Sequence, residues 1–204
     1  MTPEAAEHRV TRGHGLLEKF LASRRAHQAN SLIPEKARSG RILDVGCGSY
    51  PTFLFNTRFA ERYGVDRVTL TDVRDDRLTL VEHDIAGGSG LPFEDSFFEV
   101  VTMLAVFEHL ETAALRRLLQ EIRRVLRPGG FYVLTTPVRW TEGLLKLMSS
   151  VGLLSHEEVN EHKAQYSAPE VVTLLLDGGF ERSNIRHGTF ELGMNHWAVA
   201  QRNR

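Results

Sequence analysis

The sequence feature that most constrains the fold is an apolar run that ends in a glycine turn. Residues 41–51 read RILDVGCGSYP, with Asp44 near the end of the run and Gly46 and Gly48 in the turn. Such a pattern is typical of the first strand of an open α/β sheet as it enters a nucleotide-binding loop. Glycines one residue apart let a ligand lie against the backbone, and the acid places a negative charge at the strand end. We therefore expect a ligand site at this turn.

Short apolar or β-branched runs alternate with helical patterns along the rest of the chain. A stripe of apolar residues from Leu115 to Leu126 predicts a helix, which Pro128, Gly129 and Gly130 end. Further helices are expected at 16–26, 52–64 and 169–180, and further strands at 67–73, 78–85, 97–104, 131–137, 183–192 and 195–202. This alternation predicts an α/β fold built from βαβ units with right-handed crossovers.

Length and composition favour a single globular domain. The chain has 204 residues, of which 42% are hydrophobic and 25% are charged, which is long enough for one substantial core. We expect one domain over residues 1–204, with an N-terminal helical lid at 1–40 and a helical insertion at 138–167. The insertion is expected to cap the carboxyl edge of the sheet.

Charge and cysteine content bear on partners and compartment. The formal net charge of −1 provides no electrostatic reason to bind nucleic acid or an anionic membrane. The lone Cys47 cannot form an internal disulfide, and the chain has neither a secretory leader pattern nor an apolar run of about 20 residues. These observations predict a cytoplasmic protein without a membrane or nucleic-acid partner. Oligomeric state is not readable from the sequence.

The spacing of the glycines narrows the choice of ligand. A dinucleotide-binding loop needs a third glycine three residues after the second, and Pro51 occupies that position. A methyltransferase loop usually has its third glycine one position earlier, where this chain has Tyr50. The turn alone is compatible with a dinucleotide or a sulfonium cofactor, although Pro51 weakens the first interpretation.

Several segments in order resemble a class I S-adenosylmethionine-dependent methyltransferase. They are LDVGCG, the acid Asp72, HDI at 83–85, FEVVTMLAVFEHL and LRPGGFYVLTTP, and the resemblance covers about 41–137, returning more weakly at 161–180. The resemblance implies a Rossmann-like three-layer sandwich with a seven-stranded, mostly parallel sheet whose last strand is antiparallel. It also implies that S-adenosylmethionine lies across the carboxyl ends of the first strands.

The chemistry of that cofactor agrees with the acids at the expected strand ends. S-adenosylmethionine carries an ammonium group, a sulfonium, a ribose diol and an adenine but no phosphate, so carboxylates and bare backbone suit it. Asp44, Gly46 and Gly48 are expected at the methionine portion. Asp72, which follows Gly48 by 24 residues, is expected at the ribose diol, with Val73 beside it.

The resemblance also assigns residues to the adenine and to the methionine amine. Asp84 would accept from the adenine amino group, and the backbone of Ile85 would meet a ring nitrogen. Leu104, at the end of the fourth strand, would direct backbone carbonyl groups toward the methionine amine. Each of the three acids could instead only cap a turn after its strand, which is a common role for such residues.

Candidate residues on the acceptor side follow from the same resemblance. His109, just beyond the fourth strand, lies where related enzymes place groups that face the methyl acceptor, and histidine titrates near neutral pH. His162 and Tyr166 are further candidates for substrate contact. Cys47 is assigned no chemistry, because a small residue between glycines is usually a spacer.

Metal binding is not expected. Glu108 and His109 resemble the acid–histidine pair of quinone O-methyltransferases that bind a divalent ion, but Ala105 replaces the upstream acid. His156 and His162, six residues apart, do not share a helix face.

The sequence therefore predicts an enzyme that transfers a methyl group from S-adenosylmethionine to a small-molecule acceptor. Methyl transfer needs no obligatory nucleophile on the protein, because the sulfonium already activates the methyl group. A non-catalytic S-adenosylmethionine-binding sensor or partner subunit is consequently an open alternative. The acceptor, and whether its oxygen, nitrogen or carbon is methylated, also stay open.

Overall fold

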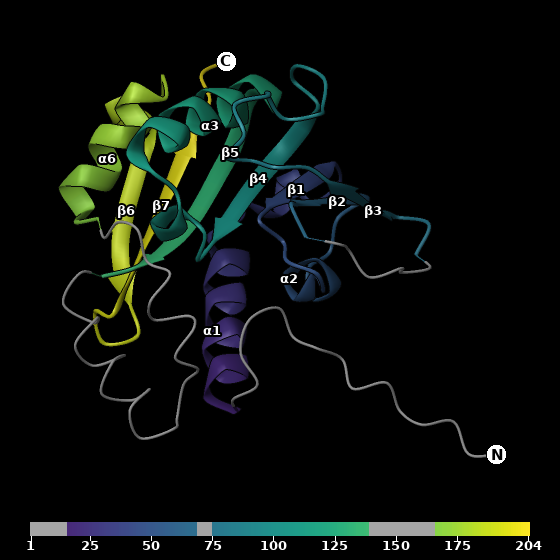
Figure 1. Cartoon of the computed structure of the whole chain (residues 1–204), viewed down its shortest axis with the longest axis horizontal. Helices are drawn as coiled ribbons and strands as arrows, with labels where there is room; N and C mark the ends of the chain where they lie inside the picture. The colour runs from purple at the N-terminus through teal and green to yellow at the C-terminus, as the bar shows by residue number, and fades with distance from the viewer. Residues whose placement is uncertain (1–15, 69–74, 139–165) are drawn as a thin grey trace.

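A computed structural model describes residues 16–68, 75–138 and 166–204. Helices cover both faces of one sheet, which gives three layers (Figure 1). The strands are β1 (Arg41–Val45), β2 (Glu61–Asp66), β3 (Leu78–Glu82), β4 (Phe98–Leu104), β5 (Leu126–Pro137), β6 (Ile185–Phe190) and β7 (Asn195–Gln201). The helices are α1 (Leu16–Leu32), α2 (Thr52–Phe55), α3 (Thr112–Val125) and α6 (Ala168–Asp177), with 3₁₀ turns η1 (Glu35–Ala37), η2 (Phe107–His109) and η3 (Arg182–Asn184).

The sheet has seven strands in the order β3-β2-β1-β4-β5-β7-β6. Strands β1 to β5 pair with one another in parallel, whereas β7 is antiparallel to both β5 and β6. The prediction of a mostly parallel sheet with an antiparallel last strand is therefore confirmed. The strand order reverses between β1 and β4, and in such sheets ligands bind in the crevice outside the carboxyl ends at that point.

Two apolar clusters form the core, one on each face of the sheet. On one face, α3 and α6 bury the apolar stripe that the sequence predicted, including Leu115, Leu119 and Ile122 (Figure 1). On the other face, the last turn of α1 and the turn η1 place Ala29, Ile33 and Ala37 against β1, β4 and β5.

That part of the N-terminal segment contributes side chains to the core of the fold. The lid role of residues 1–15, and that of the insertion at 139–165, lie outside the described residues and stay predictions. No helix within the described ranges is long and apolar enough to cross a membrane.

The second strand differs from the sequence-based prediction. The second strand was expected at 67–73, but β2 is formed by Glu61–Asp66, whose first four residues fall in the segment predicted as a long helix from 52 to 64. Residues 67 and 68 lie beyond this strand, and 69–73 lie outside the described residues. The observed helix, α2, has four residues. The pairing of β2 with both β1 and β3 overrides local preference here. Gly64 permits the close packing, since a Cβ at this position would lie 2.7 Å from the Cys47 Sγ.

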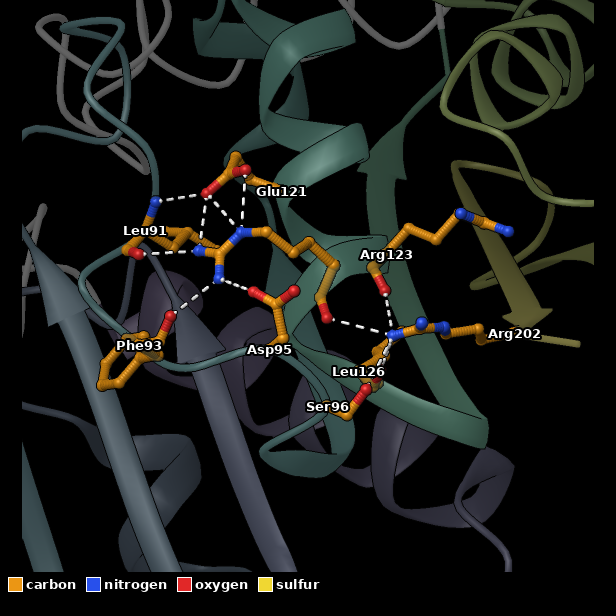
Figure 2. Close-up of polar contacts among 9 residues, drawn as sticks. Leu91, Phe93, Asp95, Ser96, Glu121, Arg123, Leu126 and Arg202 are labelled. Atoms are coloured by element: carbon orange, nitrogen blue, oxygen red, sulfur yellow. Dashed lines mark hydrogen bonds and ion pairs between the residues drawn. The ribbon is translucent and has the colours of Figure 1, made fainter. Parts of the chain in front are cut away.

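Two arginines fix the loop between β3 and β4 and the end of the chain against α3 (Figure 2). Arg124 donates to the carbonyl oxygens of Leu91 and Phe93, both at 2.9 Å, and pairs with Asp95 and Glu121, both at 2.7 Å. Arg202 donates to carbonyl oxygens at the end of α3, which otherwise lack helical partners. The loop that carries Asp84 and Ile85 is thereby attached to a rigid helix.

Candidate functional site

Buried polar residues gather at the carboxyl edge of the parallel strands. Among the described residues, all buried polar or charged residues except Thr57 lie at or beside this edge; they are Asp44, Asp66, Thr102, Glu108, Thr135, Thr136, Asn195 and His196. Burying a polar group is costly unless it is paired, so a concentration of this kind favours a binding site at the edge.

The glycine turn lies where the sequence predicted it, directly after β1. Gly46 and Gly48 have φ angles of +76° and +75°, which residues other than glycine rarely adopt. A Cβ on Gly46 would lie 2.4 Å from a methyl carbon of Val106, which follows β4. The turn therefore packs directly against the loop after β4, and glycine is required at position 46 for both conformation and space.

Asp66, at the end of β2, is a site residue that the sequence analysis missed. Its carboxylate is buried and accepts from the backbone N–H of Gly48 at 2.8 Å and of Val68 at 3.2 Å. Asp72 and Val73, predicted for the ribose side, lie outside the described residues, and Asp72 does not end β2. The spacing could have identified Asp66, because it follows Gly48 by 18 residues, close to the roughly 20 expected for an acid of this kind.

Asp44 is a buried carboxyl next to the same turn. It accepts from the Thr102 hydroxyl at 2.7 Å. Burial raises the pKa of Asp44 from its ordinary value of 3.8 to about 7; the Thr102 hydrogen bond opposes this shift, and the charge of Asp66 adds to it. Two neighbouring acids, one of which disfavours ionisation of the other, make this corner attractive to a cationic or hydrogen-bond-donating ligand.

Cys47 lies between the two glycines and is buried. Burial and the charges of Asp44 and Asp66 raise the pKa of its thiol far above the ordinary value. Because a thiolate is the reactive form, this thiol is poorly suited to nucleophilic chemistry. Tyr50, in the position of the usual third glycine, packs against Phe55 with ring centroids 4.9 Å apart.

The predicted adenine-side residues follow β3. Asp84 is exposed, and one of its carboxylate oxygens accepts from the backbone N–H of Ala86 at 2.9 Å, as in a turn cap. Ile85 packs at the edge of the α3-side core. Leu104 ends β4 and is followed by Ala105 at a φ of 56°, a sharp change of direction at the edge of the sheet. Contacts of these residues with a cofactor stay predictions.

His109, the first candidate for the acceptor side, is the last residue of η2 and is half-buried. Tyr166 is buried, packs edge-on against Phe107 with centroids 5.1 Å apart, and has its hydroxyl 3.4 Å from the Thr112 hydroxyl. These contacts give Tyr166 a packing role, and its contact with substrate stays a prediction. His162 lies outside the described residues.

Within the described residues, no group of three histidine, cysteine or acidic side chains is arranged to hold a metal ion. The site chemistry instead fits S-adenosylmethionine. Asp44 and Asp66 offer carboxylates that suit the ammonium group and the ribose diol of this cofactor, and the glycines at positive φ leave the backbone bare beside them. Fold and site together define a Rossmann-like protein that binds a nucleoside-bearing, cationic cofactor.

Comparisons with known proteins identify the family. The sequence profile described as "Methyltransferase domain" matches residues 43–134. The chain is 34% identical over 194 residues to a protein of Encephalitozoon cuniculi named as a methyltransferase, covering 85% of this chain and 86% of the relative. It is 30% identical over 171 residues to a Mycolicibacterium smegmatis protein named as an S-adenosylmethionine-dependent methyltransferase, covering 82% of this chain and 62% of that protein.

Solved structures agree with the fold. A chain of the complex between the Haloferax volcanii Trm112 methyltransferase activator and a methyltransferase superposes with a TM-score of 0.67 at 16% identity, over 92% of this chain and 93% of that chain. An S-adenosylmethionine-dependent methyltransferase of Thermotoga maritima gives 0.66 at 15% identity, over 92% of each chain. The chain belongs to the class I S-adenosylmethionine-dependent methyltransferase family. It is an enzyme whose cofactor is S-adenosylmethionine.

Proposed function

We propose that this enzyme methylates a small-molecule acceptor at the carboxyl edge of its sheet. The observation that carries the proposal is the burial of the polar groups on the acceptor side, where Glu108 is 2% exposed and His196 is 8% exposed. Enclosed polar groups suit a ligand that enters the fold, whereas an extended polymer would contact an open surface. The near-neutral charge of the chain agrees, because binding to nucleic acid depends largely on basic surface.

The cofactor half of the site is proposed to lie at β1, β2 and β4. Asp44 and the glycine turn would hold the methionine portion, and Asp66 would accept from the ribose hydroxyls in the role first assigned to Asp72. Asp84, Ile85 and Leu104 keep the adenine and amine contacts proposed from the sequence. The bound cofactor supplies a methyl group already activated by its sulfonium.

The acceptor half is proposed to lie beyond β4 and β5. Groups there would orient the acceptor in line with the methyl group, and orientation accounts for most of what a protein can contribute to such a displacement. His109 is the candidate for holding or removing the acceptor proton, because an imidazole can do so near neutral pH.

The test combines binding with turnover. Calorimetry should show binding of S-adenosylmethionine and S-adenosylhomocysteine, and release of S-adenosylhomocysteine should depend on an added small molecule from a metabolite library. Methylation of RNA or protein fractions with no small-molecule substrate would contradict the proposal. Cofactor binding with no acceptor-dependent release from any class would instead favour the sensor or partner-subunit alternative.

A further inference from the structure

The turn between β6 and β7 holds a buried acid at the carboxyl edge of the sheet. The Glu191 side chain is 6% exposed, and the side chain of Asn195, the first residue of β7, donates to its carboxylate oxygen Oε2 at 2.6 Å. Figure 1 shows this turn and α1 extending beyond the carboxyl end of β4. Glu191 therefore lies on the acceptor half of the edge, and its ion pair with Arg24 connects it to α1.

The other carboxylate oxygen of Glu191 is buried and unsatisfied. Oε1 makes no hydrogen bond within the described part of the chain. The Nε atom of Arg24 lies 3.9 Å from Oε1, which is beyond hydrogen-bonding distance, and the Arg24 side chain is 53% exposed. Buried polar atoms in folded proteins are normally hydrogen-bonded, so an unsatisfied carboxylate oxygen at a ligand-binding edge indicates a place for a donor from the ligand.

The backbone of the turn supports a role for the Glu191 side chain. Glu191 and Leu192 have φ angles of 52° and 55°, and the Gly193 N–H donates to the Phe190 carbonyl oxygen at 3.1 Å. Two-residue hairpin turns with two positive φ angles strongly favour asparagine and glycine. Backbone preference therefore does not account for a glutamate at this position, and the contacts of its carboxylate do.

Glu191 shares one face of the sheet with the cofactor corner. Trp197, two positions beyond Asn195 on β7, packs against the core cluster on the α1 face, so Asn195 and the carboxylate that it contacts lie on that face. Asp44 lies on the same face, because Ile42 belongs to the same cluster. The α1 side of the carboxyl edge thus has one acid beside the glycine turn and another beside the β6–β7 turn.

The region between these two acids is short enough for a small molecule to span. Strand β5 separates the end of β4 from the start of β7, so these two strands are about 10 Å apart. Thr135, on β5, is opposite both Leu104 and Trp197, and its buried hydroxyl also makes no hydrogen bond within the described residues. An acceptor held at Glu191 can therefore reach the cofactor corner across β5.

The charge of the Glu191 site favours a cationic ligand. An ammonium group that donates to Oε1 forms a charge-assisted hydrogen bond, which is stronger than a neutral one. A ligand carboxylate at Oε1 would instead be a like charge in a buried setting, which is unfavourable. Because the Arg24 side chain is half-exposed, it can turn toward solvent while such a ligand binds.

We propose that Glu191 anchors the methyl acceptor through an ammonium group, and that the enzyme therefore selects cationic, amine-bearing acceptors. The inference rests on the proposed function, of which it names the substrate class. Glu191 is thus a specificity-determining residue on the acceptor half of the edge, and cofactor binding stays with the residues around the glycine turn.

The experiment uses the full chain saturated with S-adenosylhomocysteine. The probes are para-fluorobenzylamine, para-fluorobenzyl alcohol and para-fluorobenzoate, which carry an ammonium, a hydroxyl and a carboxylate on the same ring. Broadening of the fluorine resonance during titration with protein measures the affinity of each probe. We expect the amine to bind at least tenfold more tightly than the alcohol or the benzoate, because only the amine forms a charged hydrogen bond with Glu191.

Variants separate recognition from packing. Glu191→Gln keeps an oxygen for the Asn195 hydrogen bond but removes the charge, so amine binding should weaken about tenfold while alcohol binding stays within twofold. Arg24→Gln removes the competing cation and should strengthen amine binding about two- to fivefold. Glu61→Gln, an acid paired with Arg41 where β1 and β2 begin, is the matched control and should bind the amine as the wild type does.

The signs of the two effects distinguish a ligand-binding role from a structural one. Both Glu191→Gln and Arg24→Gln break the same ion pair, so a structural role predicts changes in amine binding of the same sign. Opposite signs identify Glu191 as the group that contacts the amine. Binding of S-adenosylhomocysteine should be unchanged in all three variants, and the half-exposed Arg24 carries the test if Glu191→Gln does not fold.

The outcomes also distinguish this inference from the function on which it rests. If the wild type does not bind S-adenosylhomocysteine, the proposed function fails and the inference falls with it. If it binds S-adenosylhomocysteine but holds the amine no more tightly than the benzoate, the selection of amines is overturned while the methyltransferase assignment stands. Changes of the same sign in Glu191→Gln and Arg24→Gln, or an equal loss in Glu61→Gln, would also overturn it.

Discussion

Replacing Asp44 with asparagine tests the electrostatics of the glycine turn. The folded protein raises the pKa of this carboxyl from 3.8 to about 7, mainly because the group is buried. A raised pKa in an acid means that the folded state binds a proton more tightly than the unfolded chain does. The free energy of unfolding of the ligand-free enzyme therefore falls as pH rises between those two values.

The size of the effect follows from the two pKa values. Each pH unit between them is worth about 1.4 kcal/mol, so ionisation of Asp44 should cost about 3 kcal/mol of stability between pH 5 and pH 7. Asparagine cannot ionise, and its carbonyl oxygen can still accept from the Thr102 hydroxyl. Relative to the wild type, the variant should therefore gain about 2–3 kcal/mol of stability between pH 5 and pH 7.5.

Urea denaturation of both proteins at pH 5, 6, 7 and 7.5, without cofactor, measures this difference. Other titrating groups are common to the two proteins, so they cancel in the comparison. If Asp44 binds the ligand's ammonium group as proposed, calorimetry at pH 7.5 should also show at least tenfold weaker binding of S-adenosylhomocysteine to Asp44→Asn. A stability difference that stays constant from pH 5 to pH 7.5 would refute the reasoning about the buried carboxyl.

Three further substitutions test the neighbouring contacts. Asp66→Ala removes the acceptor of the Gly48 N–H, and cofactor binding should weaken by about 1.5–3 kcal/mol in calorimetry; unchanged affinity would exclude Asp66 from the site. Gly46→Ala forces a side chain into a positive φ and against Val106, so urea denaturation should show a loss of about 2 kcal/mol or more. An unchanged free energy of unfolding in Gly46→Ala would mean that the turn accommodates a side chain, which would contradict this prediction. Arg124→Met leaves two carbonyl oxygens and two acids without their cationic partner. Urea denaturation should show a loss of about 1–3 kcal/mol in the free energy of unfolding, a range that allows for the partial exposure of these groups. A loss confined to high pH, or no loss, would contradict the structural role of Arg124.

Local patterns in the sequence predicted much of the fold. The glycine turn after β1 could be predicted because only glycine adopts its positive φ angles without strain. Helix α3 could be predicted because its apolar stripe and the Pro-Gly-Gly that follows are local features. The alternation of such elements was sufficient to predict a mostly parallel α/β sheet.

The position of β2 could not be predicted in this way. The segment 61–66 has a weaker strand pattern than 67–73, and it becomes a strand because it pairs with β1 on one side and β3 on the other. This error misplaced the acid at the end of the strand, so Asp72 was chosen and Asp66 was overlooked. Strand propensity reflects packing against neighbours, and those neighbours are distant in sequence.

The sequence by itself indicated the class of enzyme, because the glycine turn and the ordered segments that resemble a methyltransferase are local features of the chain. Tertiary structure alone decided which polar groups meet at the carboxyl edge. Thr136 and His196 are 60 residues apart and become neighbours only through the register of β5 and β7. Asp66 reaches Gly48 only because β1 and β2 are paired. Such contacts depend on hydrogen bonding between strands that are distant in sequence, so short-range sequence patterns do not predict them.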